Sequence, residues 1–562
     1  MIPKVRFIFV FLFLIITNWV NAQSLALNVF AESDKATATI DSIGYNKVFS
    51  NYKTLETEVY TLKDKLIRTG YIDFKIESIK KENDTLYNAS IYIGVKLNVI
   101  KVFFKPDFNT ELLKLTNASV SLNYFEVDIS QLEITLNTLN KAIAEEGDPF
   151  STLRLINIRK ENRKTIAADL TLKNNQKRSI DKIIVKGYEK FPKAYIKRFL
   201  KLKEGKSFNL EEIRSKTQLL EELRFAKEVK DPEVLFTNDS TILYIYTEKT
   251  RSNNFDGFLG FGTNENTNRI EFDGFLDLRL VNNLNYGESL RILYKSDEID
   301  QQTFDIRVNA PYLFGSPIGL DLGLNLFRKD STFSTDKQQV RLNYQINANH
   351  RIGVGISATN SSNLLDNSTS ILNDYNTNYT EVNYNYIKPQ YYDPLFPINF
   401  WFDITAGFGN RTQNDIELSQ SAFTLETYKV FNLNPKNSVF VRVTGASLTS
   451  DDYLDNELYR FGGINSIRGF EENSLVANLY GVLNTEYRYR LSNTIYVHSV
   501  FDAAYFENEI TNNETNLFGF GFGLGLLTQA GLFKLNYSSG KTENRSFRLS
   551  DSKVHVSLTA TF

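Results

Sequence analysis

The periodicity of the sequence changes at Arg251, and this change sharply limits the possible folds. From Arg251 to residue 562 apolar and polar residues alternate, and the helical spacing of three and four residues does not recur. Alternation by two is typical of strands that bury one face. We predict sixteen such strands, near residues 254–263, 267–280, 286–297, 302–310, 317–328, 336–346, 350–360, 376–388, 398–409, 421–432, 436–449, 477–491, 493–506, 516–528, 530–540 and 551–562.

This series of strands favours a transmembrane β-barrel. No segment after the N-terminus is apolar for long enough to form a spanning helix. Backbone amides inside a bilayer must be paired without water, and among strand structures only a closed barrel achieves this. An even strand number is usual for outer-membrane barrels. The alternative is a set of soluble β-sandwich modules.

The prolines of this region fit a barrel. They are predicted to lie between strands, where a missing backbone amide does no harm: Pro311, Pro317, Pro389, Pro394, Pro397 and Pro435. All of them follow even-numbered strands, so their connections share one end of the barrel. Short turns are typical of the periplasmic end. The long connections 361–375 and 450–476 are therefore expected outside the cell.

The N-terminus resembles an export signal. Lys4 and Arg6 precede the apolar run 7–16, and Ala22 ends a small-residue cleavage site. A membrane anchor is the alternative, but about 20 apolar residues would be needed for it. We predict a signal peptide at residues 1–22, and hence a protein that acts outside the cytoplasm.

Charge and composition exclude several classes of function. With 64 basic and 66 acidic residues the net charge is −2, so nucleic acid is not a predicted partner. The chain has no cysteine, which excludes disulfides, thiol catalysis and a lipid-modified N-terminal cysteine. The three histidines lie on separate predicted strands without other ligands at metal-binding spacing: His350, His498 and His555. We predict no metal, no cofactor and no enzymatic activity.

One glycine series could be mistaken for a nucleotide-binding loop. Its members are Gly519, Gly521, Gly523 and Gly525. Their period is two and no helix follows, so a glycine-lined strand is the better interpretation.

Before the barrel, residues 23–250 mix helical and strand patterns. Each of three segments has an amphipathic helix, a tight turn and two alternating strands, and the turn positions 70, 147 and 224 are equally spaced. Equal spacing indicates three copies of one small α+β domain. The predicted domains are 23–96, 97–176, 177–250 and the barrel 251–562. The apolar helix positions are Leu55, Val59, Leu62 and Leu66 in the first copy and Leu132, Leu136, Leu139 and Ile143 in the second.

The third copy has the clearest pattern. A strand is predicted over 180–185, a helix beginning at Pro192, and a second helix capped by Asn209, with strands over 226–236 and 241–247. Its segments "IDKIIVKGYEKF" and "LKLKEGKSFN" resemble a POTRA domain, the periplasmic module of outer-membrane assembly and secretion proteins. An unspecified α+β sandwich is the alternative.

The segment "YRFGGINSIRGFEENSL" at 459–475 resembles the signature loop of the BamA/TamA-type outer-membrane assembly family, the bacterial surface antigen superfamily, which is related to two-partner secretion transporters. The resemblance implies that this sixth extracellular loop folds into the lumen and pairs its Arg with a strand acid. The signature tetrad is Ile467, Arg468, Gly469 and Phe470.

The acid partner is predicted from "SVFDAAYF", which resembles the family's F-x-D-x-G strand and puts Asp502 at the acid position. The match departs from the pattern at Val500 and Ala504. Alternation in "VLNTEYRYRL" puts Glu486 on one face with Asn484, so Glu486 is a second candidate partner. A guanidinium and a carboxylate form bidentate, charge-assisted bonds, which supports a latch between loop and wall.

The family resemblance also implies a function. Such proteins lie in the outer membrane with their POTRA modules in the periplasm, receive unfolded β-barrel proteins there, and insert them through a seam between the first and last strands. Glycines weaken a strand, so the expected seam residues are Gly257, Gly260 and Gly262 with the terminal Phe562. The expected partners are the bilayer and unfolded barrel proteins, with periplasmic chaperones and accessory lipoproteins.

Other functions stay open on the sequence alone. The main alternative is a transporter of the two-partner secretion type, which exports one specific protein through its lumen. A plain channel or receptor barrel would not need the tetrad or the modules. A role in lipid transport is a further possibility.

Overall fold

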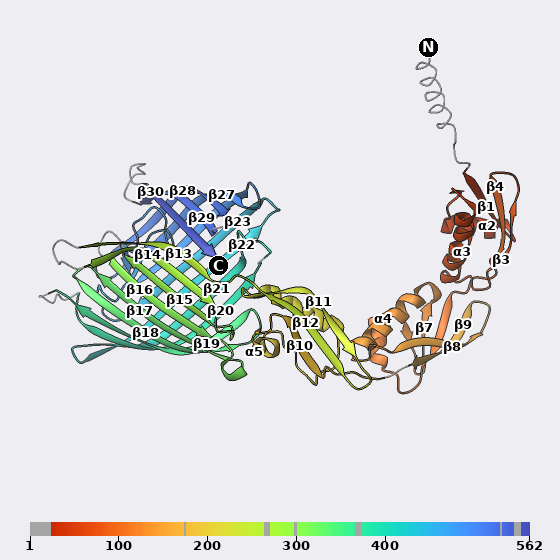
Figure 1. The fold of residues 1–562 in the computed structure, drawn as a ribbon, viewed down its shortest axis with the longest axis horizontal. Coiled ribbons are helices and arrows are strands. Elements are labelled where there is room, and N and C mark those ends of the chain that lie inside the picture. Colours follow the sequence, from red (N-terminus) through yellow and green to blue (C-terminus); the bar gives the residue numbers. More distant parts are fainter. Residues whose placement is uncertain are drawn as a thin grey trace, which may run out of the picture. The chain divides into compact units, whose positions relative to one another are not determined.

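The computed structural model describes residues 24–561 except 174–175, 264–269, 297–300, 366–371, 391, 529–530 and 544–551, and it leaves out the side chains of 258–263, 270–273 and 555–561 (Figure 1). The predicted signal peptide 1–22 and Phe562 lie outside the described residues. The chain divides into two units, one reaching Ser179 and including Ser207–Leu210, the other comprising Ile180–Lys206 and the chain from Glu211 onward. Among the described helices none is long and apolar enough to cross a membrane.

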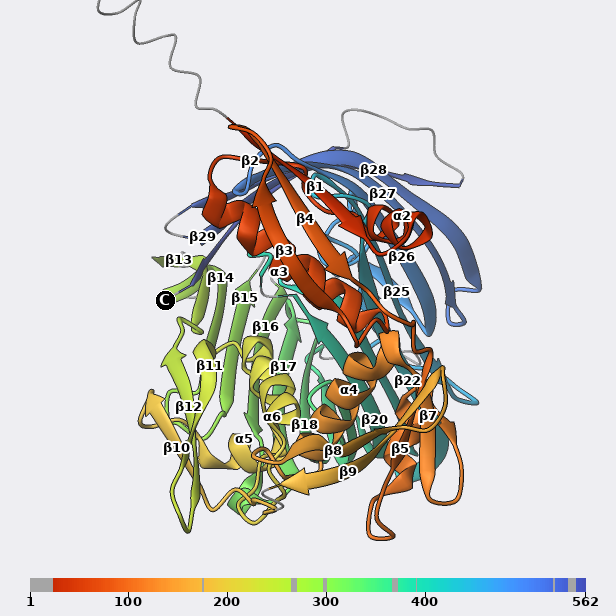
Figure 2. The same cartoon turned by 90° about the vertical axis from the view of Figure 1, so that its right-hand side faces the viewer.

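The first module packs two helices on one face of a sheet (Figure 2). Its sheet order is β2-β1-β4-β3, with β1 parallel to β4. The predicted apolar helix positions are fully buried, and the glycine at the predicted turn, Gly70, has φ +107° and its Cα faces the carbonyl of Leu97, where a Cβ would clash. The elements are β1 (Leu25–Ala31), α2 (Asp34–Ile43), β2 (Val48–Phe49), α3 (Tyr52–Arg68), β3 (Lys75–Lys81) and β4 (Leu86–Tyr92).

The second module repeats the plan with one helix. Leu139 and Ile143 of that helix are buried against a sheet of order β6-β7-β5-β9-β8, and Gly147 takes φ +104° after it. The elements are β5 (Val99–Phe103), η2 (Thr110–Leu115), β6 (Ser119–Val120), β7 (Tyr124–Asp128), η3 (Ile129–Gln131), α4 (Leu132–Glu145), β8 (Thr152–Lys160) and β9 (Thr165–Lys173).

The third module, in the other unit, has the sheet order β10-β12-β11. Its first strand begins two residues later than predicted, because the amide of Ile180 donates to the carbonyl of Lys206 outside the ladder. The elements are β10 (Lys182–Gly187), α5 (Lys193–Arg198), α6 (Leu210–Thr217), η4 (Gln218–Glu222), β11 (Ala226–Phe236) and β12 (Thr241–Lys249).

Sixteen antiparallel strands form a closed barrel, so the prediction of an α+β region followed by a sixteen-stranded barrel is confirmed. The strands are β13 (Asn254–Thr263), β14 (Ile270–Val281), β15 (Ser289–Ser296), β16 (Gln301–Ala310), β17 (Ile318–Lys329), β18 (Phe333–Gln345), β19 (His350–Asn363), β20 (Tyr375–Pro389), β21 (Ile398–Gln413), β22 (Ile416–Asn432), β23 (Asn437–Thr449), β26 (Leu479–Arg490), β27 (Ile495–Asn508), β28 (Asn513–Thr528), β29 (Gly531–Thr542) and β30 (Lys553–Thr561). Between β23 and β26, β24 (Tyr459–Phe461) and β25 (Leu475–Ala477) form a small hairpin; η5 (Leu313–Gly315) follows β16.

The two faces of the barrel wall differ in the way that a bilayer requires. Outward side chains such as Val354, Ile356 and Phe522 are apolar and exposed, whereas inward ones such as Glu381 and Asn383 are polar and buried. An apolar outer face and a polar interior are the pattern of outer-membrane barrels.

One proline departs from its predicted place. Pro389 is the last residue of β20, paired with Ile398 after a register shift at Lys388, and does not lie in the connection. A strand end tolerates proline because the ladder needs no amide there. The remaining barrel prolines lie between strands as predicted.

The third module contacts the connections that follow β14, β16 and β18. The Tyr188 hydroxyl donates to the side chain of Asn285 at 2.7 Å, and Arg198 Nε donates to the carbonyl of Gly315 at 2.7 Å. Lys201 Nζ donates to the carbonyl of Ile346. Connections after even-numbered strands therefore lie at the end of the barrel that faces this module.

An aromatic contact also holds the third module against this end of the barrel. The ring of Tyr195 lies edge-on to Tyr312 with centroids 4.9 Å apart, and its hydroxyl donates to the carbonyl of Gly287 at 3.2 Å. Gly287 has φ +79° and a Cβ there would lie 2.1 Å from the Tyr195 ring. The third module therefore packs on the barrel through backbone and aromatic contacts.

Candidate functional site

The predicted signature loop, loop 6, connects β23 to β26 and folds against the inner face of the barrel wall. Its glycines allow the sharp reversals this needs, since Gly462, Gly463 and Gly469 all have positive φ. Arg468 is only 5% exposed. Ile467 is fully buried with Phe461 among inward residues of β26 to β28, and Phe470 packs against this cluster.

Arg468 meets both acids proposed as its partners. Its Nε donates to Asp502 Oδ2 at 2.8 Å and its Nη2 to Oδ1 at 2.6 Å, which makes the bond bidentate. Its backbone amide also donates to Asp502 Oδ2, at 2.9 Å. Nη1 donates to Glu486 Oε1 at 2.5 Å. The loop backbone and the guanidinium thus fix each other against β26 and β27.

Burial and ion pairing have opposite effects on the pKa of Arg468. Burial alone would lower the pKa of the Arg468 guanidinium, but the hydrogen bonds to Asp502 and the charges of both acids outweigh it and raise the pKa above its usual value. The Asp502 side chain is fully buried. Removing one partner of such a buried pair leaves the other charge uncompensated, at a cost of about 3–5 kcal/mol.

Glu486 is shared with a second arginine. Arg488 Nε donates to Glu486 Oε2 at 2.8 Å, from two positions along the same inward face of β26. Arg468, Glu486 and Arg488 therefore form one continuous ionic chain. The alternation that places Glu486 and Asn484 on one face of this strand also places Arg488 there, but no sequence signal assigns it a partner.

The glycine series lies on the inner face of β28, and its first member makes room for the loop. Gly519 pairs with Asp502, and a Cβ on it would lie 2.4 Å from the carbonyl oxygen of Arg468. A Cβ on Gly469 would lie 2.3 Å from the amide of Gly540 on β29. The sequence interpretation of a glycine-lined strand thus gains a physical reason.

A second anchor at the base of loop 6 was missed by sequence reasoning. Arg411 of β21, 1% exposed, donates to Glu457 of the loop. Glu457 also accepts from Gln420 of β22, and Asn456 donates to Ser361 of β19 at 2.9 Å. No local motif distinguishes these residues, since their partners lie tens of residues away in sequence.

Loop 6 also contacts strands near the predicted seam. Glu471 binds Lys553 of β30 at 2.9 Å, and Glu472 binds Lys295 of β15 at 2.8 Å. β30 lies on one side of the junction with β13, and β15 on the other. The loop therefore bridges the junction between the first and last strands.

That junction is short. β13 pairs with β30 through three residue pairs, from Asn254 to Asp256, whereas β29 and β30 pair through seven. Gly257 follows with φ +145°, and a Cβ there would lie 2.1 Å from the carbonyl oxygen of Phe275. Gly260 and Gly262 pair with β14. Phe562 lies outside the described residues.

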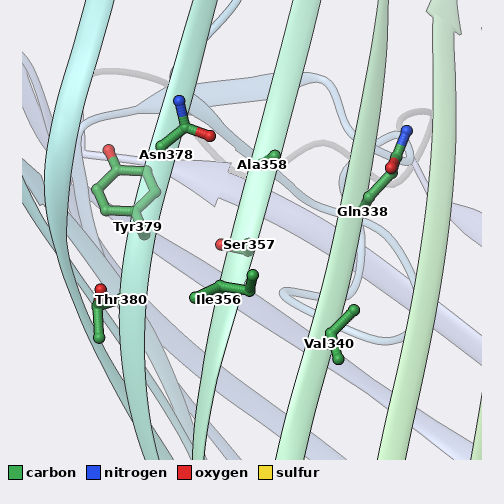
Figure 3. Close-up of a pocket in the computed structure, with 8 residues that line it drawn as sticks. All are labelled: Gln338, Val340, Ile356, Ser357, Ala358, Asn378, Tyr379 and Thr380. Carbon is green, nitrogen blue, oxygen red and sulfur yellow. The ribbon is translucent and has the colours of Figure 1, made fainter.

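A hollow on the barrel wall does not belong to this site. It has a volume of about 290 Å³ on β18, β19 and β20 and includes the outward residues Val340 and Ile356 (Figure 3). It is lined by none of the predicted site residues and by no charged side chain.

Comparison with protein families gives two matches. Residues 282–561 match the Omp85 superfamily domain, and residues 179–249 match the POTRA repeat described as surface antigen variable number repeat. A curated relative, outer membrane protein assembly factor BamA of Buchnera aphidicola, is 26% identical over 296 residues. The match covers 50% of this chain and 46% of that protein, so the chain spans about half the length of the curated relative it matches.

Solved structures show the same fold. BamA from Haemophilus ducreyi lacking POTRA domains 1–3 superposes with a TM-score of 0.50 at 13% identity, covering 84% of this chain and all of that one. CdiB from Acinetobacter baumannii gives 0.52 at 14% identity, covering 91% and 97%. With the POTRA module, the sixteen-stranded barrel and the family matches in agreement, the chain belongs to the Omp85 superfamily.

Proposed function

We propose that this protein is an outer-membrane assembly factor of the BamA/TamA type. Its modules receive unfolded β-barrel proteins in the periplasm, with chaperones and accessory lipoproteins as further partners, and the seam between β13 and β30 inserts them into the bilayer. The protein inserts these clients by binding them and not by enzymatic chemistry. The observation that carries the proposal is the three-pair junction braced by loop 6.

A short junction is suited to strand exchange. Beyond Asp256 the described part of β13 is paired with β14 alone. A strand edge with unpaired amides and carbonyls is a template on which another strand can form. An incoming barrel protein would gain backbone hydrogen bonds there while few existing pairs are lost.

The bracing loop supports controlled opening. The bonds of Glu471 and Glu472 reach strands on both sides of the junction, and Arg468 fixes the loop to β26 and β27. The barrel can keep its shape through this loop while the three pairs separate. A plain channel has no need of such an arrangement.

The first test is depletion of the protein followed by mass spectrometry of outer-membrane and secreted proteins. Loss of many barrel proteins is expected for an assembly factor, because their insertion depends on the seam. Loss of one exported protein alone would instead establish a transporter of the two-partner secretion type. An unchanged barrel proteome would contradict the assembly function.

The second test locks the seam. The chain has no native cysteine, so a disulfide between Phe255→Cys and Ala560→Cys, which are paired across the junction, would be the sole cross-link. Oxidation should stop insertion of barrel proteins and reduction should restore it. The matched control is Leu483→Cys with Ala503→Cys, paired between β26 and β27. Full activity of the oxidised seam variant would exclude lateral insertion.

A further inference from the structure

Residues 393–396, in the connection between β20 and β21, pack against the inner face of the barrel wall. Leu395 and Phe396, both less than 10% exposed, form a buried cluster with Val430 of β22 and Tyr496 of β27. Leu527 and Leu532, from β28 and β29, pack against the same cluster. β27 is not a neighbour of β21 in the barrel. The segment Asp393–Phe396, here called the inner turn, therefore crosses to strands on another part of the wall.

The wall residues that it contacts face the lumen. Tyr496 lies on the same face of β27 as Asp502, which binds Arg468 inside the barrel, since the two are an even number of residues apart. The exposed ring of Phe501 lies on the opposite face. The connection follows an even-numbered strand, as do the connections that contact the third module. The inner turn therefore lies in the lumen at the end facing that module.

The inner turn has a defined conformation. Asp393 Oδ1 accepts the backbone amides of Leu395 at 3.1 Å and Phe396 at 3.3 Å. The side chain of Gln390 donates to the carbonyl of Phe396 at 2.6 Å and accepts from Asn432 of β22 at 3.2 Å. These hydrogen bonds orient the side chains of Leu395 and Phe396 toward the wall. The inner turn is therefore an ordered part of the fold.

Charged contacts tie the inner turn to β26. Asp393 binds Arg490 at 2.5 Å. The guanidinium of Arg488 lies 4.5 Å from the ring centroid of Phe396 and 4.1 Å from that of Phe440. A guanidinium over an aromatic face is an attractive contact that strengthens when water is excluded.

Arg488 also binds Glu486, and Glu486 binds Arg468 of loop 6. Loop 6 and the inner turn thus approach one wall from opposite ends and share a single ionic chain on β26. Movement of either segment changes the environment of the residues that hold the other.

We propose that the inner turn is a gate at the module-facing end of the lumen, and that Glu486 and Arg488 couple its position to that of loop 6. This gate is independent of the choice between assembly and export. When the inner turn leaves the wall, the lumen gains an aqueous path toward the third module.

The gate is tested by ion conductance of the full-length protein in planar lipid bilayers. Phe396→Ala removes both the apolar packing and the contact with Arg488, and should raise the open fraction at least about tenfold, the ratio that corresponds to 1.4 kcal/mol. The matched control is Tyr392→Ala, in the same connection but 83% exposed, which should conduct like the wild type. Equal open fractions in the two folded variants would overturn the gate.

A milder variant keeps the test decisive even if Phe396→Ala does not fold. Asp393→Asn keeps the size and the amide contacts of the side chain but loses the ion pair with Arg490, and it should also raise the open fraction. In addition, Phe396→Cys with Tyr496→Cys can be joined by a short bifunctional thiol reagent that reductant reverses. The joined form should stay closed and reopen on reduction, and an open joined form would contradict the proposal.

Coupling is tested by a double-mutant cycle on the same measurement. Arg468→Lys, Phe396→Ala and the double variant are compared, because independent sites give multiplicative effects on the open fraction. A double variant that departs from the product of the single effects by several-fold supports coupling through β26. A simple product would show that the two segments act separately.

Discussion

At the scale of single residues, the lumen holds charges that would be costly if they were unpaired. Arg468 is surrounded by Asp502 and Glu486, and the second buried arginine, Arg411, is met by Glu457. Water and salt screen such buried pairs only weakly, so the attraction between their charges stays strong. The pairs therefore hold loop 6 in a defined position. The position of loop 6 thus depends on a few atoms.

Arg468 itself gives the first residue-scale prediction. Arg468→Ala should destabilise the barrel by about 3–5 kcal/mol, because the buried Asp502 loses its arginine partner while Glu486 keeps only Arg488. Arg468→Lys should cost less, since the charge remains while the bidentate geometry is lost. Both are measured by the urea concentration at which the compact, heat-modifiable form disappears. Equal midpoints for the alanine variant and the wild type would refute the structural importance of the latch.

Gly519 allows a second prediction with a close control. Gly519→Ala should destabilise the protein by about 1–3 kcal/mol, because its Cβ would press on the carbonyl of Arg468. Gly481→Ala, on β26, meets nothing within 4 Å and should leave the urea midpoint unchanged or raise it slightly. A larger loss in the control than in Gly519→Ala would contradict the proposed close contact.

At the scale of elements, the joint between the third module and the barrel combines hydrogen bonds with an aromatic contact at Tyr195. Tyr195 of α5 contacts Tyr312 and Phe225, with centroid distances of 4.9 and 5.2 Å. Burial raises the pKa of the Tyr195 hydroxyl above its usual range, so it stays protonated as a donor to Gly287. The module is therefore held by packing that is specific in geometry.

Loss of this packing should free the third module. Tyr195→Ala is expected to weaken the joint by about 3–5 kcal/mol, the cost of truncating a buried aromatic residue. Trypsin should then cleave the connection after Lys249 or Arg251 much faster, which a cleavage time course measures. Tyr286→Ala is the control, because Tyr286 lies in the contacted turn but is 72% exposed. Identical cleavage rates in the two variants would rule out Tyr195 as an anchor.

The same joint should depend on pH through Glu222. Burial raises the pKa of the Glu222 carboxyl above its ordinary value of 4.5, and the hydrogen bond from Asn349 offsets this only in part. The protonated form is therefore favoured in the joint, and this contribution is lost as the pH rises through the raised pKa. Glu222→Gln should remove that dependence and protect the connection from cleavage near neutral pH. If the wild-type protein instead lost its protection from trypsin as the pH fell, the pH dependence would have the opposite sign and the prediction would be wrong.

At the scale of the whole molecule, each of the two units has its own core. The first two modules bury separate apolar clusters, and the third module and barrel are joined by the contacts described above. Removal of residues 24–178 should therefore leave a barrel with the usual heat-modifiable form, while delivery of clients by the modules is lost. Electrophoresis and the barrel proteome measure the two outcomes. A truncated protein that fails to form the barrel would show that the units depend on each other for folding.

Much of the architecture was predictable because it follows from the local periodicity of apolar residues. Alternation by two located the strands to within a few residues, and the apolar spacing of Leu55, Val59, Leu62 and Leu66 identified α3. Pro389 was placed in a connection although it ends β20, since local rules do not fix a strand end. The acids that contact Arg468 were chosen through the family resemblance together with alternation, which assigns a face but not a partner.

The sequence by itself determined the class of fold, the strands with their two faces, the modules before them and the loop that carries Arg468. Only the tertiary structure decided which inward residues meet: Glu457 with Arg411, Glu471 with Lys553, and Phe396 with Arg488. Periodicity depends on neighbours a few residues apart, whereas these contacts join residues 46 to 92 positions apart. They form only when loop 6 and the inner turn fold against the wall of the closed barrel.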